Sequence, residues 1–201
     1  MFCIYCNNKK LYQLSSNQVR CARCKKKFSP KRVQRQREIQ QCFADGLTAK
    51  QTAYRLDLNY ITVSKHYKKI RADIIIELEN DFKKSEQKSY DEYIYIEKSK
   101  IKNNELFRAK DFITFEYGDG KVYNLLMPAL DRYKDIEAKE LRRFLESSKL
   151  QSSPIYKTTI QKFWQYFEEG IVRYKGVSDD NFFEYLKEFE WRFNREIEYY
   201  I

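Results

Sequence analysis

Residues 3–24 read CIYCNNKKLYQLSSNQVRCARC, and their cysteines form two Cys-x-x-Cys pairs, Cys3–Cys6 and Cys21–Cys24, with fourteen residues between them. Two intervening residues let both sulfurs of a pair reach one ion, and four thiolates close the tetrahedral shell of a structural zinc. Two disulfides or four unrelated thiols are the alternative, which a reducing compartment disfavours. Residues 10–14 and 18–21 suit a hairpin. The stretch therefore predicts a zinc ribbon over residues 1–30.

The charge of the chain is unevenly distributed. The 201 residues include 39 Lys and Arg against 29 Asp and Glu, a formal net charge of +10. Residues 1–72 hold 17 basic and 3 acidic residues, whereas residues 73–201 hold 22 and 26. This asymmetry indicates a polyanion-binding part carried by a separate globular part. Nucleic acid is favoured over an anionic membrane, because the basic half has no amphipathic helix with a strongly apolar face.

No apolar run reaches the ~18 residues of a membrane span. The first residues also lack the basic and apolar regions of a secretory leader. We therefore expect a cytoplasmic protein without a membrane partner.

Three helical patterns follow the cysteine pairs. They are expected over residues 33–44, 48–56 and 60–73, with Thr48 and Asn59 as N-caps of the last two. The small side chain of Ala53 would let these last two helices cross closely. The pattern is typical of a helix-turn-helix over residues 31–73, whose last helix would enter the major groove of DNA. A generic three-helix bundle is the alternative.

This arrangement predicts the residues that contact DNA. Nine Lys and Arg lie between Arg20 and Arg37 without an acid, which favours phosphate contact over a merely solvated face. From this run the phosphate-binding candidates are Arg23, Lys25, Lys26, Lys27, Arg32 and Arg35. On the third helix we expect base-edge contacts from Tyr60, Ile61, Ser64 and Lys65, and phosphate contacts from Lys68, Lys69 and Arg71.

The acidic half has a different pattern. A polar stretch at residues 83–88 predicts a linker, placed over residues 74–88, before a third domain at 89–201. Strands are expected over residues 90–96, 112–117 and 121–127, and helices over residues 137–148, 158–170 and 179–194. Three antiparallel strands followed by helices indicate an α+β domain.

The order of these modules resembles one bacterial family. With DEYIY at residues 91–95, FW at 163–164, YKGVS at 174–178 and YLKEFEWRFN at 185–194, the chain is similar to zinc-ribbon insertion-sequence transposases of the ISXO-like type. The likeness covers nearly the whole chain except a central gap. It implies a multi-domain protein with a zinc ribbon, a helix-turn-helix and a shortened RNase H-like α+β domain. It further implies double-stranded DNA as partner, a homo-oligomer and a bacterial nucleoid location.

The resemblance also implies three acidic residues that hold two Mg²⁺ or Mn²⁺ ions for strand cleavage and transfer. Asp91 matches the first of these acids. The second belongs to a strand for which this sequence has no counterpart. The third is a Glu in an Ile-Glu-x-Phe-Trp motif, where this chain reads IQKFW at residues 160–164, so that Gln161 replaces it. One carboxylate cannot hold two such ions, because these cations require several oxygen ligands.

Three functions follow. The first is a transposase-like protein that binds specific DNA sequences, contains a structural zinc and keeps an inactive catalytic remnant, as a regulator or an accessory of a full-length transposase. The second is an active transposase with a rearranged acidic site that uses Mg²⁺ or Mn²⁺. In that site Asp91 would be joined by Glu92, by Asp131 or Asp135, and by Glu168 or Glu169.

The third function is a scaffold whose basic face binds RNA. The aromatic residues of the basic half are Phe2, Tyr5, Tyr12 and Phe28. They lie apart in the sequence without a stacking motif, so this function ranks last.

Overall fold

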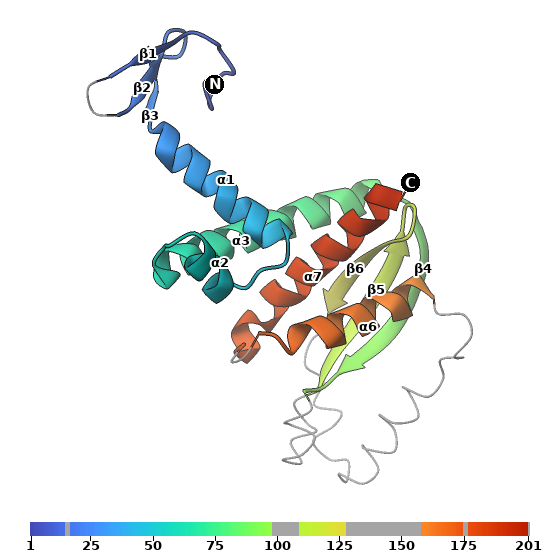
Figure 1. Ribbon diagram of the computed structural model, residues 1–201. Coiled ribbons are helices and arrows are strands. Elements are labelled where there is room, and N and C mark those ends of the chain that lie inside the picture. Colours follow the sequence, from blue (N-terminus) through green and yellow to red (C-terminus); the bar gives the residue numbers. More distant parts are fainter. Residues whose placement is uncertain (15–16, 98–108, 128–157, 175–176, 201) are drawn as a thin grey trace. The chain divides into compact units, whose positions relative to one another are not determined.

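The computed structural model describes residues 1–14, 17–97, 109–127, 158–174 and 177–200. Within these ranges the chain is an α+β protein with two three-stranded sheets and five helices (Figure 1). It divides into two compact units, Met1–Ile70 and Arg71–Ile201, called unit 1 and unit 2 below.

The sheet of unit 1 is built around the cysteine pairs. Strands β1 (Leu11–Gln13), β2 (Val19–Cys21) and β3 (Lys27–Phe28) are antiparallel in that order. The predicted hairpin is confirmed, and β3 is a further strand that the sequence reading missed. The buried side chains of this sheet belong to Cys3, Val19, Cys21 and Phe28. So small a core stabilises little on its own.

Three helices follow this sheet, where the sequence predicts them. They are α1 (Pro30–Ala44), α2 (Ala49–Arg55) and α3 (Tyr60–Lys84). Both predicted caps are confirmed, because Thr48 forms a capping box with Gln51 and the Asn59 side chain accepts a hydrogen bond from the Ile61 amide at 2.8 Å. These bonds satisfy amide groups that a helix start leaves without partners.

The turn between α2 and α3 has a defined shape. Asp57 adopts a left-handed conformation with φ of 51°. The amides of Asp57 and Leu58 donate to the carbonyls of Tyr54 and Ala53, respectively. These two bonds form a Schellman motif, which ends α2 sharply and allows α3 to start only a few residues later.

The predicted linker over residues 74–88 is wrong. Helix α3 continues to Lys84 and strand β4 begins at Gln87. Ile74 and Leu78 are buried in unit 2 at helical spacing. Phe82, one turn further, stacks on Tyr123 with ring centroids 4.3 Å apart. Ile74, Leu78 and Phe82 form an apolar stripe on one side of the helix. The helix extends beyond residue 73 because this stripe packs within unit 2.

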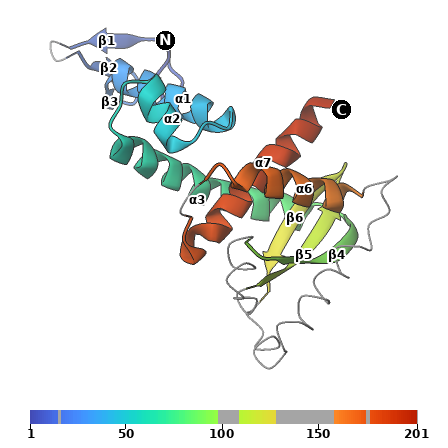
Figure 2. The same ribbon diagram turned by 60° about the horizontal axis from the view of Figure 1, so that its bottom comes forward.

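Unit 2 contains the predicted meander. Strands β4 (Gln87–Tyr95), β5 (Lys110–Tyr117) and β6 (Lys121–Leu126) are antiparallel in the order β4-β5-β6. Helices α6 (Thr159–Ile171) and α7 (Asp179–Tyr200) lie on one face of this sheet (Figures 1 and 2). The helix expected at residues 137–148 lies outside the described residues, as do Asp131 and Asp135.

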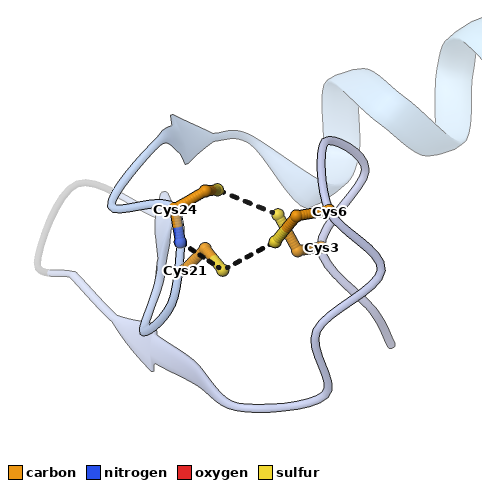
Figure 3. Close-up of side chains that lie close together, drawn as sticks. All are labelled: Cys3, Cys6, Cys21 and Cys24. Atoms are coloured by element: carbon orange, nitrogen blue, oxygen red, sulfur yellow. Dashed lines mark hydrogen bonds between the residues drawn. The ribbon is translucent and has the colours of Figure 1, made fainter.

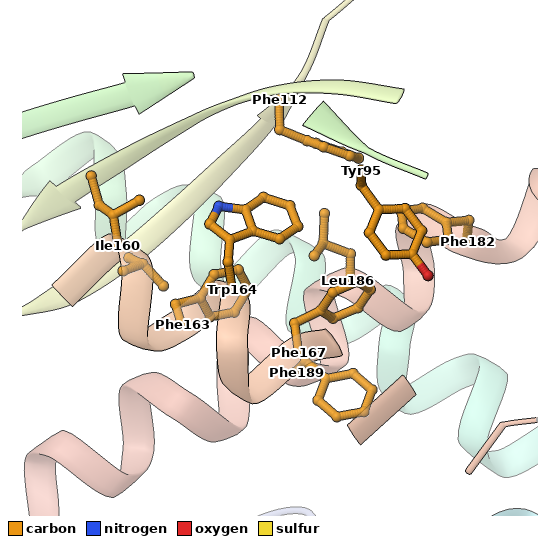
Figure 4. Close-up of a cluster of buried hydrophobic side chains, with 10 residues drawn as sticks. Tyr95, Phe112, Ile160, Phe163, Trp164, Phe167, Phe182, Leu186 and Phe189 are labelled. Carbon is orange, nitrogen blue, oxygen red and sulfur yellow. The ribbon is translucent and has the colours of Figure 1, made fainter. Parts of the chain in front are cut away.

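The core of unit 2 is largely aromatic. Trp164 of α6 stacks on Tyr93 of β4, with ring centroids 3.9 Å apart and an interplanar angle of 10°. Figure 4 shows the buried cluster around it, whose members are Tyr95, Phe112, Val122, Ile160, Phe163, Phe167, Phe182, Leu186 and Phe189. Helices α6 and α7 cross closely at Gly170, where a Cβ atom would lie 2.2 Å from Cε1 of Phe189. Offset and edge-on ring pairs of this kind stabilise the fold beyond the contribution of burying their apolar surface.

Side chains of α7 satisfy the backbone of β6. The Asn194 amide accepts a hydrogen bond from the Val122 N–H at 2.8 Å and donates one to the Val122 carbonyl at 2.9 Å. Glu190 accepts from the Asn124 N–H at 3.0 Å. Buried backbone groups require such partners, and here helix side chains take the place of a neighbouring strand.

A buried charge cluster joins α3 to α7 within unit 2. The Glu188 carboxylate accepts hydrogen bonds from Arg71 and from Arg192, each at 2.6 Å, and from the Tyr174 hydroxyl at 2.8 Å. Burial, together with the Glu188 charge, raises the pKa of Tyr174 above its usual value. Two arginines and a hydroxyl donor stabilise a carboxylate that would be costly to bury alone.

Candidate metal centre and nucleic-acid interface

Four sulfur atoms converge in unit 1. The Sγ atoms of Cys3 and Cys24 lie 3.6 Å apart, those of Cys6 and Cys21 lie 3.5 Å apart, and all four lie within 4.8 Å of one another (Figure 3). A tetrahedral zinc with Zn–S bonds of ~2.3 Å spaces its sulfurs roughly 3.8 Å apart. A disulfide would bring two sulfurs to about 2 Å. The cysteines are free thiols whose arrangement suits a structural metal ion such as zinc.

The two Cys-x-x-Cys turns repeat the same backbone bonds. The Asn7 amide donates to the Cys3 carbonyl at 2.9 Å, and the Lys25 amide donates to the Cys21 carbonyl at 3.1 Å. Asn7 and Lys25 are both left-handed, with φ of 55° and 59°. A left-handed conformation is costly for a lysine, and in this turn it accompanies the hydrogen bond from the Lys25 amide to the Cys21 carbonyl.

Backbone donors favour the ionised form of one thiol. Burial acts to raise the pKa of Cys21, but the amides of Cys24 and Arg23, and then the neighbouring thiols, outweigh it and lower this pKa to about 6. For Cys24 the Lys26 amide acts to lower the pKa, while burial and the shared thiols raise it to about 11. Zinc binds thiolates, so these backbone donors would favour Cys21 as a ligand of such an ion.

Most of the predicted DNA-contact residues are exposed, and the exceptions are Ser64 and Arg71. Ser64 is half-buried. The exposed ones are Arg23, Lys25, Lys26, Lys27, Arg32, Arg35, Tyr60, Ile61, Lys65, Lys68 and Lys69. Among the described residues, no ion pair involves a Lys or Arg of unit 1. Their charges therefore face solvent without a carboxylate that would compete with a polyanion.

The phosphate contact predicted for Arg71 is wrong. Its side chain is buried in unit 2, where it binds Glu188 and lies over the Tyr185 ring with its Cζ atom 3.9 Å from the centroid. The run of basic residues suggested solvent exposure. A buried glutamate 117 positions away, which sequence spacing does not reveal, holds the arginine instead.

Tyr67 is a hydrogen-bonded tyrosine that positions the start of α3. The buried Tyr67 hydroxyl lies 2.6 Å from the Thr52 hydroxyl and donates to the Leu47 carbonyl at 3.0 Å. Its ring packs edge-on against Phe43, 4.9 Å between centroids. These contacts hold α3 against α1 and α2, with the Tyr67 side of the helix turned inward.

Asp91 lies on the first strand of the sheet of unit 2. It is exposed on β4, where its carboxylate accepts a hydrogen bond from the Glu92 amide at 2.9 Å. In the part of the chain that the structure describes, the four cysteines are the only group of three or more His, Cys, Asp or Glu that suits a metal ion. The described residues therefore do not fit a two-ion carboxylate site.

Gln161 has a structural role in place of a carboxylate ligand. Its side-chain oxygen accepts from the Thr158 amide at 3.1 Å, and its own amide donates to the Thr158 hydroxyl at 3.2 Å. These reciprocal bonds form the capping box at the start of α6. A glutamine fills this position as well as a glutamate, so the fold does not require an acid here.

The other acids considered for a rearranged site have different neighbours. Glu92 follows Asp91 directly on the strand and so points to the opposite face of the sheet. Glu168 accepts from the Tyr93 hydroxyl at 2.5 Å, and Glu169 accepts from Gln165 at 2.8 Å. None of them forms a metal-binding group with Asp91 among the described residues.

The chain was compared with protein-family models, with curated proteins and with solved structures, and no match was found. Within the described ranges no helix is both long and apolar enough to cross a membrane.

Proposed function

We propose that the chain is a transposase-like DNA-binding protein without strand-transfer activity. In this proposal the cysteine cluster and its sheet form a zinc ribbon, and α2 with the start of α3 forms a helix-turn-helix. Unit 2 is a shortened RNase H-like domain. The role is regulatory or accessory to a full-length transposase, in a bacterial cytoplasm.

The observation that supports DNA binding is the exposure of the basic side chains in unit 1 and their lack of ion pairs among the described residues. They are exposed and, among the described residues, none takes part in an ion pair. Unpaired surface cations bind phosphates by releasing counterions. The first turns of α3 add exposed Tyr60, Ile61 and Lys65, side chains able to read base edges in a major groove.

The absence of catalysis is inferred from chemistry. Asp91 belongs to no metal-binding group among the described residues, and Gln161 caps α6. Two-ion catalysis requires carboxylates that clamp the attacking and leaving oxygens.

A selection with cleavage readout tests both parts. The zinc-loaded protein is mixed with a labelled duplex library, with and without Mg²⁺ or Mn²⁺, and retained and cut DNA are sequenced. We expect retention of a defined sequence and no cleavage. Metal-dependent nicking that is lost in Asp91→Ala would refute the inactive remnant and establish the rearranged site. Absence of retention would refute DNA recognition.

A further inference from the structure

The N-terminal turn of unit 1 carries an unusual apolar surface. Met1, Phe2, Ile4 and Tyr5 are 43–64% exposed, although Cys3 between them is buried. These four side chains line one groove, closed on the other side by the first turns of α1 with Lys31, Val33, Gln34 and Arg37. The aromatic residues of this half lie apart in the sequence. The structure places Phe2 and Tyr5 on the same groove.

Apolar, polar and cationic residues line the groove together, and the cysteines Cys3 and Cys6 are among them. Residues 1–37 contain eleven Lys and Arg and no Asp or Glu. Lys9 lies over the Phe2 ring at 5.8 Å, and Lys26 lies over the Tyr5 ring at 4.7 Å. Lys31 and Arg37 of α1 also line the groove. Each exposed ring thus has a cation beside it.

We propose that this groove binds unpaired nucleotides of single-stranded DNA, with bases on Phe2 and Tyr5 and phosphates on the surrounding lysines and arginines. Charge complementarity requires an anionic ligand, and the rings require one with planar apolar faces. Base-on-aromatic stacking next to a cationic track is how sequence-tolerant proteins hold single strands. A duplex buries its base faces in its own stack and offers only edges in its grooves. The inference rests on the proposed DNA-binding function and adds a second kind of DNA site to it.

The experiment compares two DNAs that differ only in unpaired nucleotides. Binding of the zinc-loaded full chain is measured by fluorescence anisotropy with a blunt 20-base-pair duplex, and with the same duplex carrying a ten-nucleotide dT tail. We expect the tail to tighten binding. Phe2→Ala and Tyr5→Ala should each lower the affinity for the tailed duplex at least about fivefold. Affinity for the blunt duplex should stay within about twofold.

Controls separate stacking from folding. Tyr5 packs edge-on against the buried Phe28, 6.1 Å between centroids, so zinc content is measured for each variant. If Tyr5→Ala loses zinc, Phe2→Ala decides. Tyr5→Trp should keep the gain from the tail, and Tyr90→Ala, which removes a tyrosine that is 73% exposed in unit 2, should leave all affinities unchanged. A dT tail with 5-iodouracil should cross-link to the peptide that contains Phe2 and Tyr5.

Three results would overturn the proposal. The first is a tail that adds no affinity although the blunt duplex binds, which leaves the proposed function intact. The second is an equal loss for both DNAs in Phe2→Ala, which would make the groove part of the duplex site. The third is tight binding to phosphatidylserine vesicles that depends on Phe2, with no gain from the tail, which would assign the groove to a membrane surface. Failure to bind any DNA would instead refute the proposed function.

Discussion

Unit 1 and unit 2 differ in where their charged side chains point. Unit 1 holds sixteen Lys and Arg, and none of them has an ion-pair partner among the described residues. Unit 2 buries charged side chains and pairs them with one another, at Arg71, Lys187, Glu188, Glu190 and Arg192.

The two units are also stabilised differently. The sheet of unit 1 has four buried side chains, two of them cysteines, whereas unit 2 has a continuous aromatic core. So small a sheet core suits stabilisation by a metal ion at the cysteine cluster, and the basic side chains of unit 1 stay exposed. The buried charges of unit 2, by contrast, pair with one another inside its own fold.

Removal of the metal should have the largest effect. Structural zinc contributes about 10–16 kcal/mol to modules of this size. We expect Cys21→Ser, or a strong chelator, to unfold the cysteine module and abolish DNA binding, which zinc analysis and anisotropy will measure. Both tryptophans, Trp164 and Trp191, lie in unit 2, so tryptophan fluorescence should stay unchanged. Cys42→Ala, outside the cluster, should keep its zinc. Tight DNA binding by zinc-free protein would refute the claim that a metal stabilises the DNA-binding part of unit 1.

Loss of the buried carboxylate should be the next largest effect. Glu188→Ala removes the buried carboxylate that Arg71 and Arg192 share, and the loss of such a buried charge partner costs about 3–5 kcal/mol. Urea unfolding followed by tryptophan fluorescence measures this loss. The matched control is Glu169→Ala on exposed α6 surface, with an expected change below about 0.5 kcal/mol. Similar values for both variants would show that the cluster does not stabilise unit 2.

Substitution of Gly170, where α6 and α7 cross closely, should have a smaller effect on stability. The direction of this change shows whether the two helices are packed as described. In an open helix Gly→Ala stabilises by about 1 kcal/mol. At Gly170 the added Cβ meets the Phe189 ring, so we expect destabilisation by about 1–3 kcal/mol. The double variant Gly170→Ala with Phe189→Leu should recover part of this loss in the same urea assay. Stabilisation by Gly170→Ala alone would contradict the packing described.

Single lysines of unit 1 should have the smallest effects. Lys65→Ala should weaken discrimination between selected and unselected duplexes by about 1 kcal/mol, and Lys26→Ala should weaken both and reduce the salt slope of binding by about 1. Anisotropy titrations at several salt concentrations distinguish the two. Lys162→Ala, an exposed lysine of unit 2, should change neither. Identical behaviour of Lys65→Ala and Lys26→Ala would refute the recognition role of α3.

Local patterns made much of the fold predictable. The cysteine spacing, the caps Thr48 and Asn59, and the aromatic and β-branched runs of the unit 2 strands are each encoded within a few residues, and the corresponding elements are present. The candidate metal cluster was predictable for the same reason. The DNA contacts and the transposase resemblance stay predictions.

Long-range contacts explain what was missed. Arg71 was misplaced because its partner Glu188 lies 117 positions away. The end of α3 was misplaced because the surface that Ile74 and Phe82 cover comes from unit 2. The groove at Phe2 and Tyr5 was missed because its second wall belongs to α1. Sequence spacing carries no record of such partners.

The hydrogen bonds from Asn194 and Glu190 to β6 have a consequence for self-assembly. An edge strand with open N–H and C=O groups is a template on which another chain can add a strand, and this is a common route to dimers and to aggregates. Here α7 already occupies those groups at Val122 and Asn124. Addition of a strand at Val122 and Asn124 would therefore first require α7 to move away from β6.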